Sequence, residues 1–234
     1  MTRAPGTGIR EIFAEIPDTY ELVNHLMTFG LDVVWRRGAA AEASSAGGTR
    51  WLDVCTGTGE TAAYLIRRAN PGTTVAAADF SLPMLRKAMG KPSCRRIGFV
   101  AGAAEQLPFS DGSFDLVTSS FATRNINVTR DALLSCFREF HRILRPGGTF
   151  VNLETSRPPA RLFRALLDCY ARVIVKRLGS SISGSRAGYS YLAHSITRFY
   201  GAEDLASIMR EAGFSVVSFR RLTGGAAAVH RAVK

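Results

Sequence analysis

The sequence predicts an α/β protein with a seven-stranded, mostly parallel sheet, and three observations support this prediction. Short runs rich in Val, Phe and Leu alternate with segments of helical period along most of the 234 residues. The apolar runs are hydrophobic on both faces, as strands covered by helices on both sides are. The last two runs flank Thr223, Gly224 and Gly225, which indicates an antiparallel hairpin at the end of the chain.

Each element is predicted from the local pattern. Residues 9–43 carry apolar side chains at helical spacing, and Pro17 divides them into two helices because proline disrupts a helix interior. We expect strands at residues 50–55, 73–79, 97–101, 114–120, 148–154, 214–221 and 225–232. We expect further helices at residues 59–69, 82–90, 129–144, 158–178 and 202–212. Residues 179–188 are rich in Gly and Ser and are expected to form a loop.

Length and composition limit the function classes. A chain of 234 residues fits one α/β domain, 1–234. The net charge of +11 indicates either attraction to an anionic partner or a device for solubility. Four scattered cysteines offer no paired ligand spacing, so we expect no metal site. The sequence has no signal-peptide core and no long apolar run, so we expect a cytoplasmic location.

A glycine-rich turn follows the first strand. Gly57 and Gly59 let the backbone turn sharply and approach a ligand closely, and the helix that starts there points free N–H groups toward it. Asp79 ends the next strand, where a carboxylate accepts hydrogen bonds from ribose hydroxyls. Asp53 can hold the turn or meet a cationic amino group. The combination predicts a nucleoside-containing ligand, and by itself it fits a dinucleotide as well.

Two downstream segments select among such ligands. They are Leu107-Pro108-Phe109 with Asp111 and Phe114-Asp115, and Arg145-Pro146-Gly147-Gly148. With the glycine turn they resemble class I S-adenosylmethionine methyltransferases, which have a Rossmann-like fold. The resemblance implies S-adenosyl-L-methionine as cofactor and S-adenosyl-L-homocysteine as product. It assigns to the cofactor Asp53, Cys55, Thr56, Gly57, Gly59, Asp79, Phe80, Ala104, Glu105 and Ser119. Such enzymes often have Gly at Cys55 and Asp or Asn at Ala103, so no adenine contact is inferred for Ala103.

Six segments narrow the resemblance and cover almost the whole chain. The most specific are Arg124-Asn125, Tyr189-x-Tyr191-Leu192-x-x-Ser195-Ile196 and Leu222-Thr223-Gly224-Gly225-x-x-Ala228-x-His230. They are similar to the UbiE/MenG family, the C-methyltransferases of ubiquinone and menaquinone biosynthesis. The resemblance implies a prenylated quinol substrate, with demethylmenaquinol converted to menaquinol. It further implies a helical lid at 9–43 with Tyr20 at the cofactor, a helical substrate cap at 157–196, and Arg124 and Asn125 as catalytic residues.

The chemistry of aromatic C-methylation gives these two residues their expected roles. An aromatic carbon is a poor nucleophile until a ring hydroxyl is deprotonated, so the enzyme must stabilise a phenolate in a dry pocket. We expect Arg124 to lower the pKa of the hydroxyl and Asn125 to orient the ring. The alternative is that Arg124 only holds a surface loop. His230 has a side chain suited to accept a proton, although a hydrogen-bonded strand histidine is the simpler interpretation.

The region 157–177 is basic and amphipathic. It has six basic residues against one acidic residue, with apolar positions at helical spacing. The pattern is compatible with peripheral contact at an anionic membrane, and it is more commonly that of a cap helix that turns its apolar stripe to the core. The sequence is also compatible with a homodimer.

Three other functions remain open at this point. One is methylation of another small or lipid-like acceptor, because this fold occurs with many substrates. Another is a protein that binds the cofactor without transferring a methyl group. Nucleic-acid binding is disfavoured because the basic residues are not interleaved with aromatic residues along a strand.

Overall fold

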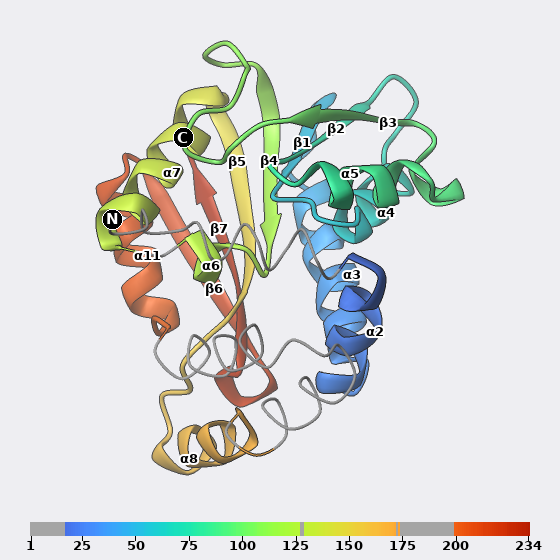
Figure 1. Ribbon diagram of the computed structural model, residues 1–234. Helices are drawn as coiled ribbons and strands as arrows, with labels where there is room; N and C mark the ends of the chain where they lie inside the picture. Colours follow the sequence, from blue (N-terminus) through green and yellow to red (C-terminus); the bar gives the residue numbers. More distant parts are fainter. Residues whose placement is uncertain (1–16, 127–128, 172, 174–198) are drawn as a thin grey trace, which may run out of the picture.

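The computed structural model describes residues 17–126, 129–171, 173 and 199–234, without the side chains of 17–20 and 23. A single sheet of seven strands has the order β3-β2-β1-β4-β5-β7-β6 (Figure 1). The strands are β1 Arg50–Val54, β2 Thr74–Asp79, β3 Ile97–Ala101, β4 Phe114–Ser120, β5 Leu144–Thr155, β6 Val216–Leu222 and β7 Ala227–Val233. Strand β7 pairs antiparallel with both β5 and β6, and the other pairs are parallel. The predicted α/β class and the C-terminal hairpin are confirmed.

Helices cover both faces of the sheet. The helices are α2 Pro17–Met27, α3 Leu31–Ser44, α4 Glu60–Ile66, α5 Leu82–Met89, α6 Thr123–Ile126, α7 Arg130–Ile143, α8 Arg161–Tyr170 and α11 Ala202–Glu211, with short 3-10 turns at Pro92–Cys94 and Thr223–Gly225. Helices α2 to α5 lie on one side of the sheet and α7 and α11 on the other (Figure 1). Helix α8 lies apart from the sheet, near the turn between β6 and β7.

Two hydrophobic clusters form the core, one on each face of the sheet. Helices α3 and α4 pack alanine and leucine side chains against one face, around the buried Trp51. Helices α7 and α11 cover the other face, where Phe137, Phe140 and Phe150 contact one another. Strands β1, β2, β4, β5 and β7 contribute apolar residues to both clusters, which explains their continuous apolar runs in the sequence.

The N-terminal helices differ from the prediction in one respect. Pro17 begins α2, as expected at the first turn of a helix, and residues 9–16 lie outside the described part. A second break, which was not predicted, separates α2 from α3. There Phe29 and Gly30 take positive φ values of 52° and 76°. A glycine accepts this conformation without strain, so Gly30 is the local reason for the break.

Other boundaries also differ. Strand β5 begins at Leu144, which pairs with Phe114, and not at residue 148 as predicted. The register then shifts before Leu116 pairs with Thr149, so the proline and glycines form an irregularity inside the strand. Helix α6 was not predicted. The predicted loop at 179–188 and most of the cap at 157–196 lie outside the described residues. Among the described residues, no helix is long and apolar enough to cross a membrane.

Candidate functional site

The candidate site lies where the strand order reverses. Strands β1 and β4 are neighbours there, and their connections leave in opposite directions along the sheet. The chain leaves both strands through a residue with positive φ, Cys55 at 54° and Phe121 at 56°. Such a conformation costs a non-glycine residue roughly 1–2 kcal/mol. The two strained turns face the crevice in which open α/β sheets bind ligands.

Asp79 closes the glycine turn. Its Oδ2 accepts a hydrogen bond from the Gly57 N–H at 2.7 Å, and its Oδ1 accepts one from the Ser81 N–H at 2.8 Å. Burial raises the pKa of Asp79, and these backbone hydrogen bonds oppose the rise. A carboxylate has about four acceptor positions, so two remain for a ligand. A Cβ at Gly57 would meet no heavy atom of the described residues within 4 Å, whereas one at Gly59 would press on Ala88 at 3.1 Å.

Asp53 holds the turn from below. Its two carboxylate oxygens accept hydrogen bonds from the Thr56 and Thr118 hydroxyls, each at 2.6 Å. Burial raises the pKa of Asp53 to about 6, against the effect of these hydroxyls and of Arg36. The first of its two predicted roles is therefore seen in the geometry, because Asp53 joins β1, β4 and the turn.

The remaining residues predicted for the cofactor surround this turn. Cys55 and Thr56 lie in the turn itself, and burial raises the pKa of the Cys55 thiol. Phe80 is 36% exposed, Ala104 is buried, and Glu105 is exposed but close enough to add to the rise in the Cys55 pKa. Tyr20 lies in α2, and its side chain is outside the described residues.

Ser119 provides a test of whether the site fits a polar ligand. It lies next to last in β4 and is fully buried. Its Oγ has no hydrogen-bond partner within the described part of the chain. An unpaired buried hydroxyl costs about 1–3 kcal/mol, so it is usually explained by a ligand or an ordered water. Ser119 follows Thr118, which pairs with Asp53 just before the glycine turn, and this place suits the polar end of a nucleoside-type cofactor.

Helix α2 is tied to the glycine turn by a lysine that sequence reasoning missed. Lys91 Nζ donates a hydrogen bond to the Thr58 carbonyl oxygen at 2.7 Å and also pairs with the Glu21 carboxylate. Burial alone would raise the pKa of Glu21, but hydrogen bonds from Lys91 and Thr58 outweigh it, so the pKa is lowered. The N-terminal helix therefore lies over the turn.

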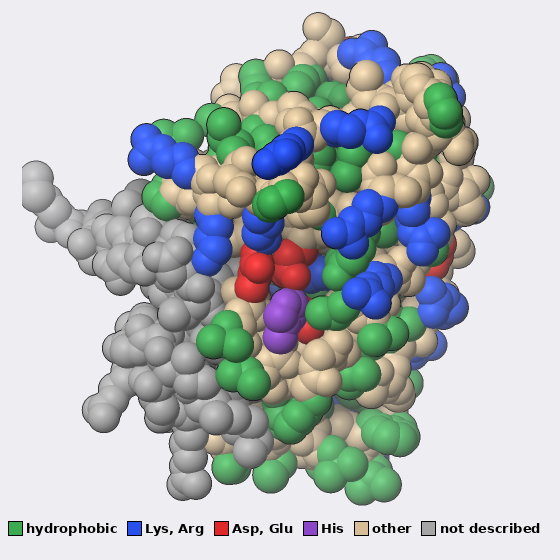
Figure 2. All heavy atoms as spheres, turned by 90° about the vertical axis from the view of Figure 1, so that its right-hand side faces the viewer, with side chains coloured by type: hydrophobic (Ala, Val, Ile, Leu, Met, Phe, Trp, Pro, Cys, Tyr) green, Lys and Arg blue, Asp and Glu red, His purple; other side chains and the backbone are tan. Residues whose placement is uncertain are grey.

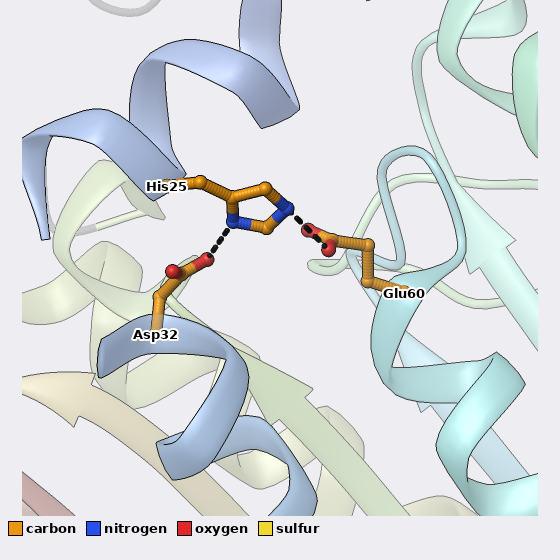
Figure 3. Close-up of side chains that lie close together, drawn as sticks. All are labelled: His25, Asp32 and Glu60. Atoms are coloured by element: carbon orange, nitrogen blue, oxygen red, sulfur yellow. Dashed lines mark hydrogen bonds and ion pairs between the residues drawn. The ribbon is translucent and has the colours of Figure 1, made fainter. Parts of the chain in front are cut away.

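A second polar cluster joins α2, α3 and α4 (Figure 3). His25 Nδ1 lies 2.8 Å from Asp32 Oδ2, and His25 Nε2 lies 3.4 Å from Glu60 Oε1. These three side chains could hold a metal ion by their spacing. However, the Arg36 guanidinium already lies 3.9 Å from Asp32 and 3.6 Å from Glu60, and both ring nitrogens face a carboxylate. We assign the group as an ion-pair cluster, because Arg36 supplies the cation.

The surrounding face is strongly basic. Figure 2 shows a small group of acidic side chains around one histidine, with many Lys and Arg side chains about it. Arg36 extends the cluster inward: its Nη1 donates to Thr61 Oγ1 at 3.2 Å, and its guanidinium lies 4.8 Å from the centre of the Phe121 ring. Helices α2 and α3 therefore contact both the glycine turn and the turn after β4.

Arg124 lies in α6, directly after the turn at Phe121. It is 7% exposed. Its Nη1 donates to Thr155 Oγ1 at 3.0 Å and lies 3.9 Å from Glu154 Oε1. Its Nε is buried and has no partner among the described residues. A buried guanidinium with an unused donor is an arrangement that can stabilise a developing oxyanion. The neighbouring Asn125 is half-buried and donates to the Phe121 carbonyl oxygen at 3.5 Å.

Glu154 holds this arginine, and sequence reasoning gave it no role. Its Oε2 accepts the Arg124 backbone N–H at 3.0 Å and the Thr123 hydroxyl at 3.1 Å. Its Oε1 accepts the Thr155 N–H at 2.7 Å and the Thr155 hydroxyl at 3.0 Å. A buried acidic residue at the end of an apolar strand was the signal that could have identified it.

His230 lies in the middle of β7 and not in the turn at the site. Its Nε2 contacts the Ala202 carbonyl oxygen at 2.9 Å. Burial lowers the pKa of His230 to about 4, so the imidazole is neutral near pH 7. The simpler of its two predicted interpretations, a hydrogen-bonded strand histidine, agrees with this contact.

Comparisons with known proteins agree with this geometry. The ubiE/COQ5 methyltransferase family matches residues 1–234. A demethylmenaquinone methyltransferase of Thermus thermophilus is 41% identical over 94% of this chain and 98% of its own. One of Roseiflexus castenholzii is 38% identical over 97% of this chain and 93% of its own. The ubiquinone/menaquinone biosynthesis C-methyltransferase UbiE of Stutzerimonas stutzeri is 35% identical over 97% of this chain and 88% of its own.

Solved structures share the fold at low identity. The [4+2]-cyclase SpnF has a TM-score of 0.67 at 16% identity, and covers 99% of this chain and 97% of its own. A SAM-dependent methyltransferase of Thermotoga maritima, described as a possible histamine N-methyltransferase, has a TM-score of 0.59 at 22% identity. It covers 92% of this chain and 98% of its own. Because a cyclase shares the architecture, the fold does not decide the reaction.

Proposed function

We propose, from the premise that this chain belongs to the ubiE/COQ5 methyltransferase family, that it methylates demethylmenaquinol to menaquinol. The chain is an S-adenosylmethionine-dependent methyltransferase that acts on a quinol ring in quinone biosynthesis. The naphthoquinol ring is favoured because the most identical relative cited, at 41%, is a demethylmenaquinone methyltransferase. The structural observation that supports ring methylation is the buried Arg124, whose Nε donor has no partner in the described part of the chain.

The cofactor is proposed to lie across the ends of β1, β2 and β4. Asp79 would accept hydrogen bonds from the ribose, and the turn at Gly57 and Gly59 would hold the methionine portion. Phe80, Ala104 and Glu105 would flank the adenine, and the Ser119 hydroxyl would meet a polar group of the cofactor. When bound, the cofactor supplies an electrophilic methyl group.

The quinol is proposed to lie against Arg124 and Asn125. The guanidinium would stabilise the phenolate form of a ring hydroxyl, which directs electron density onto the adjacent ring carbon. Asn125 would orient the ring so that this carbon faces the methyl group. Glu154 has no free acceptor position, since each of its oxygens already accepts two hydrogen bonds. It therefore orients Arg124 and is not a candidate base.

The helices α2 and α3 are proposed to form the cofactor lid. Lys91 and the cluster of His25, Asp32 and Glu60 connect these helices to the glycine turn. Because α3 packs Ala39, Ala40 and Ala43 into the core, α2 is the part of the lid that can move without exposing a large apolar surface. It would exclude water from the methyl transfer.

A peripheral membrane contact is proposed for α8. None of the residues in this helix is buried, and Leu162, Phe163 and Leu166 are 70%, 50% and 57% exposed. Phe29, at the turn between α2 and α3, is 78% exposed, and its ring lies 6.3 Å from that of Tyr170. This apolar surface, with the basic residues of the same helix, suits an anionic bilayer that carries the prenylated substrate.

The deciding experiment measures methyl transfer from labelled S-adenosylmethionine to reduced demethylmenaquinone in detergent. We expect a methylated naphthoquinol, and none with the oxidised quinone, which has no hydroxyl to ionise. Arg124→Ala should abolish turnover and leave cofactor affinity nearly unchanged, while Arg67→Ala, at an exposed site, serves as control. Turnover only with a benzoquinol or another acceptor would refute the proposed substrate.

The membrane contact is tested by sedimentation with vesicles. The protein should bind phosphatidylglycerol vesicles and not phosphatidylcholine vesicles. Changing Leu162 and Leu166 together to Ser should weaken the binding, whereas Met89→Ser, on the exposed surface of α5, should not. Equal binding of all three proteins would refute a role for α8.

A further inference from the structure

Three buried polar side chains form a row across β4, β5 and β7. Ser119 pairs with Asn152 in the parallel register, and Asn152 pairs with His230 in the antiparallel register. Paired residues project from the same face of a sheet with Cβ atoms about 5 Å apart. All three are at most 1% exposed. Ser119 Oγ, Asn152 Oδ1 and His230 Nδ1 each have no hydrogen-bond partner within the described residues.

The hydrogen bond at Nε2 decides the protonation of His230. A carbonyl oxygen only accepts, so the contact with Ala202 requires that Nε2 carries the proton. The neutral ring then has a bare lone pair on Nδ1. Burial keeps the ring in this neutral form by lowering its pKa to about 4. His230 therefore presents a proton acceptor inside the face of the sheet.

A continuous series of polar side chains leads from this row to Arg124. Asn152 Nδ2 lies 3.4 Å from Thr123 Oγ1, and the Thr123 hydroxyl donates to Glu154 Oε2 at 3.1 Å. The same oxygen accepts the Arg124 N–H. The row thus begins beside the proposed cofactor site, at Ser119, and is linked through Thr123 to the proposed ring site.

The other buried acids near the site have their oxygens occupied. Both oxygens of Asp53 accept threonine hydroxyls, and both oxygens of Asp79 accept backbone N–H groups. Glu154 accepts four hydrogen bonds. Among the described residues, each of these carboxylate oxygens already accepts a hydrogen bond, whereas His230 Nδ1 accepts none.

We propose that His230 accepts the ring proton released during C-methylation, through two waters held along the row of Ser119, Asn152 and His230. The inference rests on the proposed function, because it concerns the same ring carbon. The first water would accept from the Ser119 hydroxyl and donate to Asn152 Oδ1 and to the second water. The second water would donate to Asn152 Oδ1 and to His230 Nδ1, so that all three unpaired atoms are satisfied. The Asn152 amide assignment follows from this network.

The ring carbon gains a bond to the methyl group as the methyl–sulfur bond breaks, and it then carries both a hydrogen and a methyl group. The carbon–hydrogen bond breaks, its electron pair restores the aromatic ring, and its proton passes to the first water. That water passes one of its own protons to the second water, which gives a proton to Nδ1. His230 is then an imidazolium until the proton escapes to solvent. A weak base suffices, because rearomatisation drives the loss of the proton.

The test uses a quinol with deuterium at the methylated ring carbon. We expect methyl transfer to be slower than proton loss in the wild type, and therefore no primary isotope effect on kcat. His230→Gln can still donate to Ala202 but has no basic nitrogen. We expect kcat to fall roughly 10²- to 10⁴-fold, a primary isotope effect to appear, and cofactor affinity to stay unchanged. The control is His141→Gln. His141 lies in α7, where its ring packs against that of Phe214, and this variant should show no isotope effect.

Two further measurements keep the proposal testable. If His230→Gln does not fold, Asn152→Ser removes the carbonyl that would hold the water, and it should also produce an isotope effect. In the unliganded wild type, nitrogen NMR should find the His230 ring neutral with its proton on Nε2 down to about pH 5. The role of His230 would be overturned if His230→Gln turns over slowly without an isotope effect, or turns over at the full rate. A proton on Nδ1 of the wild-type ring would overturn it as well. No turnover by the wild type would instead refute the proposed substrate.

Discussion

Replacing Glu154 with glutamine tests the support of the catalytic loop. Glu154 is 1% exposed and joins β5 to α6 by accepting the Arg124 N–H and the Thr123 hydroxyl on one oxygen. The other oxygen accepts the Thr155 N–H and hydroxyl. Glutamine has the same shape, but its amide nitrogen donates where one carboxylate oxygen accepts. One pair of donors therefore loses its acceptor, and the Arg124 guanidinium loses its counter-charge at 3.9 Å.

The cost can be worked from these contacts. A buried donor left without an acceptor costs about 1–3 kcal/mol, and the two donors share one substitution, so their costs do not simply add. The ion pair between Arg124 and Glu154 is too long for a hydrogen bond, at 3.9 Å, so its loss adds little to this cost. We expect the free energy of unfolding to fall by about 2–3 kcal/mol, a large part of the roughly 5–15 kcal/mol typical of folded proteins. The quinol-dependent kcat should fall as well, because Arg124 is no longer held.

Urea unfolding and steady-state kinetics measure the two effects. Glu203→Gln is the matched control. The Glu203 side chain is 63% exposed and pairs with Arg221 at the surface, so the free energy of unfolding should change by less than about 1 kcal/mol. Cofactor affinity should be the same in all three proteins. If Glu154→Gln matches the control in both stability and kcat, the assigned role of Glu154 is wrong.

Three further predictions concern the cofactor turn and the buried histidine. Asp79→Asn should weaken S-adenosylmethionine binding roughly 10- to 100-fold in calorimetry, because a charged acceptor for ribose is lost; an unchanged Kd would refute the ribose contact. Because burial lowers the His230 pKa to about 4, the neutral ring contributes stability above pH 6.5, and this is lost as pH falls toward 4. Wild type should therefore lose about 3 kcal/mol relative to His230→Gln over that window in urea unfolding, and parallel curves would contradict the burial argument. Cys55→Gly should raise the free energy of unfolding in urea slightly, by about 0–1 kcal/mol, because relief of a φ of 54° exceeds the entropic cost of glycine; a clear loss of stability would show that the thiol packing matters more.

The succession of elements was predictable because it depends on local patterns. The strands around Trp51, Ala77 and Val117 are apolar on both faces, so the sequence alone indicates a covered parallel sheet. The glycine turn and its spacing to Asp79 likewise follow from the backbone freedom of glycine and the length of one helix-and-strand unit. The hydrogen bond between Asp79 and Gly57 joins residues that the prediction had already placed together.

The apolar stripe of α8 shows the limit of such patterns. A stripe at helical spacing is the same whether it faces a core or the surface, so periodicity left both interpretations open. The structure leaves Leu162, Leu166 and Cys169 exposed. Cys136 and Cys169 both lie among apolar residues in the sequence, a pattern that predicts buried positions. Cys136 is fully buried, whereas Cys169 is exposed, so the prediction was wrong for Cys169.

The sequence by itself determined the α/β class, the hairpin, the glycine turn and the arginine after β4, because each depends on residues close together in the chain. Only the tertiary structure decided which side chains support them. Glu154 meets Arg124 from thirty residues away, and His230 meets Asn152 through the β5–β7 register. Strand register is set by pairing across the whole sheet, so a one-residue slip would turn Asn152 and His230 to the opposite face. That dependence is why the polar row could not be read from the sequence.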